Sequence, residues 1–145
     1  MQARCYRQSQ EKSFLQLSEA SRNILLADRL RHVERLRFIL VGSGAERIKL
    51  MIEARHRRLN NVIFMPPQPK DDIPAVWSLC DVALVHLKNS SVFREVIPSK
   101  MFEAMGMGLP LVVASPDGEA SRILATDKAG IWVPAEDPGA LAEAT

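Results

Sequence analysis

From Arg37 onward, short apolar runs alternate with segments in which apolar residues recur at helical spacing. A short continuous apolar run is typical of a strand that is buried on both faces. Apolar residues three and four positions apart, such as Ile48, Met51 and Ile52, are typical of an amphipathic helix. The pattern predicts strands at 37–41, 62–65, 82–85, 109–114 (starting after the proline) and 131–133, and helices at 45–57, 73–80, 99–107, 118–125 and from 138 onward.

Strands that alternate with helices through short loops form parallel βαβ units. Because these strands are uniformly apolar, we expect helices on both faces of the sheet. The sequence therefore predicts an α/β fold with a Rossmann-like parallel sheet. In such sheets ligands bind at the carboxyl ends of the strands, so a site is expected among the loops 42–46, 65–72, 86–99 and 115–119.

The first residues are less regular. Residues 15–36 have helical periodicity, whereas residues 1–12 are polar and predict no strand. We therefore divide the chain into a polar segment and helix, 1–36, and a main domain, 37–145. The last residues, 140–145, stop inside a predicted helix without a capping residue, so we expect a domain that is truncated at both ends.

Composition and charge narrow the range of partners. A chain of 145 residues, 47% of them hydrophobic, is expected to form one domain with a substantial core. The formal net charge of +2 gives no general attraction to nucleic acid. Arginines nevertheless gather at 22–37 and at 55–58. They indicate either solvated helix faces or a surface that meets anionic lipid, and the sequence leaves both interpretations open.

Cysteines and histidines give little sign of metal or redox chemistry. Cys5 and Cys80 match no metal-binding or redox spacing, which is typical of a reduced, cytoplasmic chain. Asp71 and Asp72 begin a predicted helix and are interpreted as capping residues, so we predict no metal site. His86 ends a predicted strand at the ligand edge, and it is the one histidine that we expect near a site.

The main candidate for chemistry is the stretch from Glu95 to Glu103, which ends inside a predicted helix. Pro98 stiffens the entry to this helix, and Ser99 is a natural N-cap. The first turn of a helix attracts anions, and Lys100 adds a positive charge there. A diphosphate between two sugars would need this arrangement, with Glu103 on one polyol and Glu95 on the other. The alternative is an ordinary helix start with a surface glutamate.

Two further loops border the same edge. Gly42 and Gly44 follow a strand and open a helix, where they would allow a ligand to approach the backbone. Met65 and Pro66 begin a proline-stiffened loop at the end of a strand, where a ligand is expected. A plain turn and a rigid connector are the respective alternatives.

The order of these motifs closely resembles the signature of retaining glycosyltransferases of the "glycosyl transferases group 1" class. The resemblance covers residues 36–145. It rests on FILVGSG (38–44), NVIF (61–64), SLCDVAL (78–84), the two glutamates with seven residues between them, AMGMGLPLVVA (104–114), AGIWVP (129–134), DP (137–138) and ALAEA (140–144). The segment IPSKMFE (97–103) resembles a subgroup that builds bacterial surface polysaccharides, including N-acetylfucosamine transferases.

The resemblance implies a GT-B fold, of which this chain would be the half that binds a nucleotide sugar, expected to be a UDP-sugar. Glu103 would bind the ribose, and Ser99 and Lys100 would hold the diphosphate. Two catalytic roles are implied: Glu95 would contact the donor sugar, and Lys100 would stabilise the departing diphosphate. Gly42, Gly44, Met65 and Pro66 would border the donor, and no cofactor or metal is implied.

The resemblance also implies a partner half that binds the acceptor, which would be lipid-linked or a saccharide. Without it, we expect the isolated chain to have little transferase activity, because half of the cleft is missing. We expect a cytoplasmic location with peripheral membrane contact. Two alternatives remain open: a non-catalytic nucleotide-binding module, and a fragment of a sugar-nucleotide epimerase.

Overall fold

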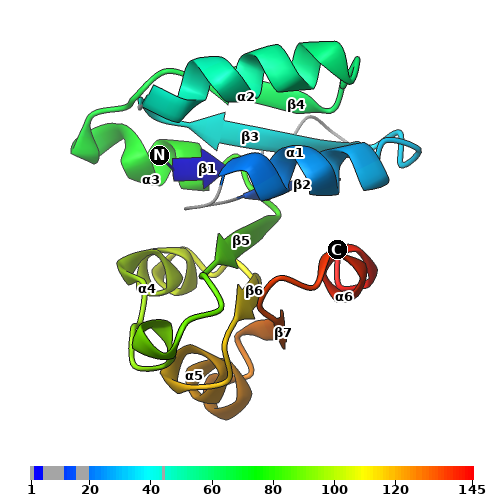
Figure 1. Ribbon diagram of the computed structural model, residues 1–145. Helices are drawn as coiled ribbons and strands as arrows, with labels where there is room; N and C mark the ends of the chain where they lie inside the picture. Colours follow the sequence, from blue (N-terminus) through cyan, green and yellow to red (C-terminus); the bar gives the residue numbers. More distant parts are fainter. Residues whose placement is uncertain (1, 5–11, 16–19, 44) are drawn as a thin grey trace.

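The computed structural model describes residues 2–4, 12–15, 20–43 and 45–145 (Figure 1). Within them, seven strands form one sheet. The strands are β1 (Gln2–Arg4), β2 (Lys12–Leu15), β3 (Leu36–Val41), β4 (Val62–Met65), β5 (Val82–His86), β6 (Leu111–Ser115) and β7 (Gly130–Pro134). The helices are α1 (Ala20–Arg29), α2 (Ala45–His56), α3 (Ile73–Trp77), α4 (Ser99–Gly106), α5 (Glu119–Asp127) and α6 (Pro138–Glu143), with short 3₁₀ helices η1 (Lys70–Asp72) and η2 (Ser91–Arg94).

The sheet has the strand order β4-β3-β2-β5-β6-β7, with every neighbouring pair parallel. Strand β1 pairs with β3 in the antiparallel sense. From β2 the chain adds β3 and then β4 on one side of the sheet. It then crosses back to β5, next to β2, and adds β6 and β7 on the other side. This confirms the Rossmann-like α/β fold, and it puts the reversal of strand order, where such sheets bind ligands, between β2 and β5.

The strand β2 is not predicted by the hydrophobic pattern, which gives residues 1–12 no strand and residues 15–36 helical periodicity. In the structure, Lys12–Leu15 pairs with β3 on one side, with Phe14 opposite Phe38, and with β5 on the other, with Phe14 opposite Val82. Its strand conformation therefore depends on partners that are distant in sequence. The hydrophobic pattern within four residues gives no information about such long-range pairing.

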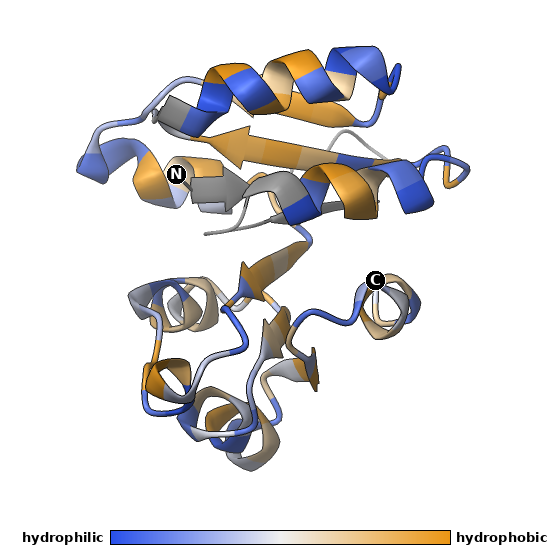
Figure 2. Cartoon of the chain, viewed as in Figure 1, coloured by the Kyte–Doolittle hydropathy of each residue, from blue (hydrophilic) through white to orange (hydrophobic). Residues whose placement is uncertain are grey.

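The core lies on both faces of the sheet, since neighbouring strand residues point to opposite sides. Leu84 of β5 belongs to a cluster with α1 and α6, whereas Ala83 and Val85 belong to a cluster with Trp77, Met101 and other residues of α3, α4 and α5. Connections β2-α1-β3 and β3-α2-β4 run one way along the sheet, so α1 and α2 share a face. Hydrophobic strands lie between the helices in Figure 2.

Helix α2 forms as the periodicity predicts, but the opposite face is buried. Leu50 and Ala54 are the buried residues, with 2% and 4% exposure. Ile48, Met51 and Ile52, which supply the predicted apolar spacing, are 69%, 44% and 53% exposed. The apolar spacing therefore identifies the helix but not its buried side, because two apolar faces compete and local spacing does not decide between them.

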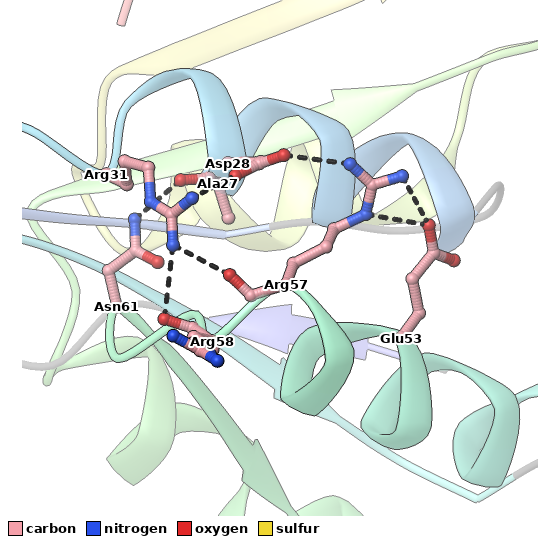
Figure 3. Close-up of polar contacts among 7 residues, drawn as sticks. All are labelled: Ala27, Asp28, Arg31, Glu53, Arg57, Arg58 and Asn61. Carbon is pink, nitrogen blue, oxygen red and sulfur yellow. Dashed lines mark hydrogen bonds and ion pairs between the residues drawn. The ribbon is translucent and has the colours of Figure 1, made fainter.

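A polar network fixes how α2 turns against α1 (Figure 3). The guanidinium group of Arg57 donates to Asp28 Oδ2 of α1 at 2.8 Å and to Glu53 Oε1 of α2 at 3.0 Å. These two hydrogen bonds raise the pKa of Arg57. Arg31 donates to the carbonyl oxygen of Arg57 at 2.7 Å, and the Asn61 amide donates to that of Ala27 at 2.8 Å. The side of α2 that carries Leu50 is thereby kept toward the sheet.

We predict that Gly118→Ala destabilises the fold. A Cβ at this position would overlap the backbone carbonyl of Arg94, at the end of η2, so one of two packed loops must move. The expected loss in the free energy of unfolding is about 1–3 kcal/mol, measured by chemical denaturation. Gly106→Ala is the matched control, because nothing lies within 4 Å of the added carbon. Equal stability of both variants would contradict the close approach of these loops.

Candidate functional site

Helix α4 begins at the carboxyl edge of the sheet, after the loop that follows β5. Its N-cap is Pro98, in an extended conformation, and Ser99 is the first helical residue, one position later than predicted for a capping serine. No side-chain hydrogen bond among the described residues caps this end. The Met101 N–H donates to the carbonyl oxygen of Pro98 at 3.0 Å, whereas the N–H groups of Ser99 and Lys100 remain available to an anionic ligand.

Lys100 lies beside this helix start and is half-buried. Burial lowers the pKa of its ammonium group, and the negative charge of Glu103 opposes that shift. Removal from water disfavours a lone cation. A dianionic ligand at the helix start would add to the negative charge of Glu103 beside this partly buried ammonium, so the position favours anion binding.

Glu103 lies one turn further along α4 and contacts α3. The indole Nε1 of Trp77 donates to Glu103 Oε2 at 3.4 Å, a long hydrogen bond. Both residues line a groove of about 490 Å³ between α3 and α4. The other lining residues are Lys70, Ile73, Pro74 and Met107. An apolar groove of this size with a carboxylate on one wall and an amine near its end suits a small polar molecule with a flat apolar part.

The glycine and proline loops meet at the same edge. Gly42 follows β3 with a φ of 136°, which favours glycine, and its N–H donates to the carbonyl oxygen of Met65 at 3.2 Å. Pro66 follows directly and leads to η1, whose Lys70 lines the groove. The structure therefore brings Gly42, Met65 and Pro66 together, whereas Gly44 lies outside the described residues.

Glu95 is separate from these residues. It follows η2, is exposed, and does not line the groove with Glu103. The loop that carries it is held from the other side by the contact between Arg94 and Gly118. The sequence predicts Glu95 and Glu103 on two different polyols, and the structure keeps them apart: Glu95 is exposed, and Glu103 lines the groove.

His86 lies on the other face of the sheet, in a cavity of about 300 Å³ between α1 and α6. Arg22 and Glu136, which form an ion pair at 2.7 Å, also line it. Burial, and to a smaller degree the positive charge of Arg22, lower the pKa of His86 from 6.5 to about 4. The histidine is therefore neutral at physiological pH and stands apart from the groove at α4.

The sequence did not predict that Trp77 and Lys70 line the groove. Trp77 is a core residue and only 2% exposed. Its indole nitrogen nevertheless reaches Glu103. The only sequence signal was the position of residues 65–72 at the end of a strand, which includes Lys70.

Comparison with known proteins gives one family. The sequence pattern of the family described as "Glycosyl transferases group 1" matches residues 4–145. The chain is 36% identical over 89 residues to WcaI of Escherichia coli K12, whose name proposes a glycosyl transferase of colanic acid biosynthesis; the match covers 61% of this chain and 21% of that protein. It is 31% identical over 111 residues to WcaL of the same organism, similarly named, covering 75% and 27%.

A third relative is the D-inositol 3-phosphate glycosyltransferase of Salinispora tropica. It is 33% identical over 103 residues, which cover 70% of this chain and 20% of that protein. The chain therefore spans between a fifth and just over a quarter of the length of these relatives. The family match begins at residue 4, so it includes most of the segment before Arg37 that the sequence resemblance did not reach.

We predict that acid weakens the fold through His86. Because its pKa in the folded protein lies below that of the unfolded chain, the unfolded chain binds the proton first as the pH falls. This destabilisation is absent above about pH 6.5 and complete below about pH 4. Between about pH 7.5 and pH 5 it amounts to about 2 kcal/mol.

The measurement is urea denaturation of wild type and His86→Gln at both pH values. Wild type should lose about 2 kcal/mol more than the variant over this range. Parallel losses in the two proteins would show that other groups cause the acid sensitivity.

Proposed function

The chain belongs to the glycosyl transferases group 1 family, and from this premise we propose that it is the donor-binding domain of a glycosyltransferase. The observation that carries the proposal is the groove between α3 and α4, with Glu103 on its wall, next to the uncapped start of α4. Glu103 lies four positions after Ser99, which is about 6 Å along a helix. A nucleoside diphosphate has its ribose diol and its first phosphate at a comparable separation.

In this proposal the base lies in the groove, against Ile73 and Pro74. The Glu103 carboxylate accepts hydrogen bonds from the ribose hydroxyls, and Trp77 holds the carboxylate. The diphosphate lies at the first turn of α4, near Ser99 and Lys100. Gly42, Met65 and Pro66 border the donor from the neighbouring strands. The donor is proposed to be a UDP-sugar, and neither a cofactor nor a metal is invoked.

The proposed chemistry is sugar transfer from the nucleotide. As the bond between sugar and phosphate breaks, negative charge grows on the diphosphate, and Lys100 and the helix start stabilise that charge electrostatically. Glu95, on the exposed loop, is proposed to contact the donor sugar. The sugar would be a hexose or an N-acetylhexosamine, with N-acetylfucosamine as one candidate.

The complete enzyme would add an acceptor-binding domain. The relatives of this chain are several times longer, and two are named for colanic acid biosynthesis. We therefore propose a role in bacterial surface polysaccharide synthesis, in the cytoplasm and at the membrane that presents a lipid-linked acceptor. On this view residues 37–145 form most of the donor domain, and the chain alone transfers little sugar because it supplies one side of the cleft.

We predict that the purified chain binds UDP and UDP-N-acetylglucosamine more tightly than GDP, and that Glu103→Ala weakens UDP binding about 10-fold or more. The reason is the loss of hydrogen bonds to a charged acceptor, each of which contributes about 1.5–3 kcal/mol. Calorimetric titration measures both effects. Glu143→Ala, in α6, is the matched control for a lost carboxylate. Wild-type affinity in a folded Glu103→Ala protein would refute the assignment of the ribose site.

A second prediction concerns Trp77. Trp77→Phe keeps an aromatic ring in the core but removes the N–H that reaches Glu103. UDP affinity should fall about threefold, because this bond to the carboxylate is long and its loss acts only through the position of Glu103. Trp132→Phe is the control, because Trp132 donates instead to Ser115, away from the groove. The same titration applies. If both variants weaken binding equally, the effect is general loosening of the core and not positioning of Glu103.

A further inference from the structure

Helix α2 presents an apolar surface to solvent. Ile48, Met51 and Ile52 lie three and four positions apart, so their side chains share one side of the helix, and all three are exposed. Leu50 and Ala54 occupy the opposite side and are buried. Single exposed apolar residues are ordinary, but three adjacent ones on one helix indicate a surface that meets something apolar. We call Ile48, Met51 and Ile52 the outer face of α2.

Positive charge surrounds this face. Residues 46–58 contain five lysines and arginines and two glutamates, which gives a net charge of +3. Lys49 and Arg55 are exposed on either side of the isoleucines. Glu53, one of the two acids, is already bonded to Arg57 at 3.0 Å. Within the described part of the chain no ion pair neutralises Lys49 or Arg55.

More arginines reach the carboxyl end of α2 from another part of the sequence (Figure 3). Arg31, in the turn after α1, donates to the carbonyl oxygens of Arg57 and Arg58 at 2.7 and 3.3 Å. The arginine-rich segments 22–37 and 55–58 are therefore joined in space. Of the nearby acidic residues, Asp28 forms ion pairs with both Arg57 and Arg31. Arg31 and Arg57 are thus paired with Asp28 and Glu53, and the exposed cations beside the outer face of α2 are Lys49 and Arg55.

Apolar side chains and cations lie next to each other on this surface. A matching partner therefore has an apolar interior beneath a negatively charged surface. We propose that the outer face of α2 docks on an anionic lipid bilayer, with the isoleucines inserted among the headgroups and Lys49 and Arg55 against them. In this proposal the contact lies in the plane of the membrane surface. No helix in the described ranges is long and apolar enough to cross a membrane. The inference rests on the membrane location proposed above, but not on nucleotide binding.

Flotation of the purified chain with lipid vesicles tests this proposal. We expect binding to vesicles of phosphatidylcholine mixed with phosphatidylglycerol, little binding to phosphatidylcholine alone, and loss of binding at high salt. The double variant Ile48→Ser, Ile52→Ser should bind at least about 10-fold less, because two apolar side chains no longer insert. Arg55→Glu should weaken binding while leaving the apolar residues in place.

The matched control is Ile131→Ser, on strand β7. Ile131 is 52% exposed, close to the 53% of Ile52, and lies on a different element. Undiminished vesicle binding by the double variant, or equal loss in the control, would overturn the proposal. So would dimers of the wild type that the double variant abolishes in light scattering without lipid, since the face would then join two copies of the chain.

A UDP titration of the same variants separates this inference from the proposed function. The vesicle variants should keep wild-type UDP affinity, because α2 does not line the groove at Glu103. Vesicle binding without UDP binding would leave the surface assignment standing and refute the donor site. UDP binding without vesicle binding would leave the donor site standing and refute the surface assignment.

Discussion

A parallel sheet of apolar strands must be covered by helices on both faces, and the rest of this structure depends on that constraint. The chain leaves β2 in one direction and returns to β5 in the other, so α1 and α2 cover one face while α4 and α5 cover the other. The parallel strands end at one edge, where their loops gather. Gly42, Met65 and Ser99 therefore share an edge because of topology, before any attraction between them is considered.

The sequence predicts well those elements whose signal is local. Continuous apolar runs identify β3, β5 and β6, because a strand covered on both faces needs apolar residues at every position. Strand β2 escapes prediction because its conformation comes from pairing with distant strands. The buried side of α2 escapes for a related reason. Leu50 competes with Ile48 and Ile52, and contacts with α1 and the sheet decide the outcome.

The candidate site divides in the same way. Ser99, Lys100 and Glu103 lie within one helix, so their relative placement follows from helical geometry and could be predicted. The contact of Trp77 with Glu103 joins positions 26 apart, and the pair of Arg22 with Glu136 joins positions 114 apart. Neither leaves a local pattern. Trp77 also shows that a core residue and a site residue are not alternatives, since a buried ring can present its one polar atom to a groove.

The two surfaces that we connect with function lie on different layers of the domain. The groove is built by α3 and α4, and its contents depend on hydrogen bonds and charge at the carboxyl edge. The outer face of α2 belongs to the layer that α1 shares, and the Arg57 network holds that layer together. The exposed residues of α2 do not line the groove, although Leu50 and Ala54 on its buried side belong to the same core cluster as Trp77. A domain of this kind can dock on a membrane through the layer of α1 and α2 and bind its donor through the layer of α3 and α4. Both layers pack on the same sheet, so the fold fixes the orientation of one relative to the other.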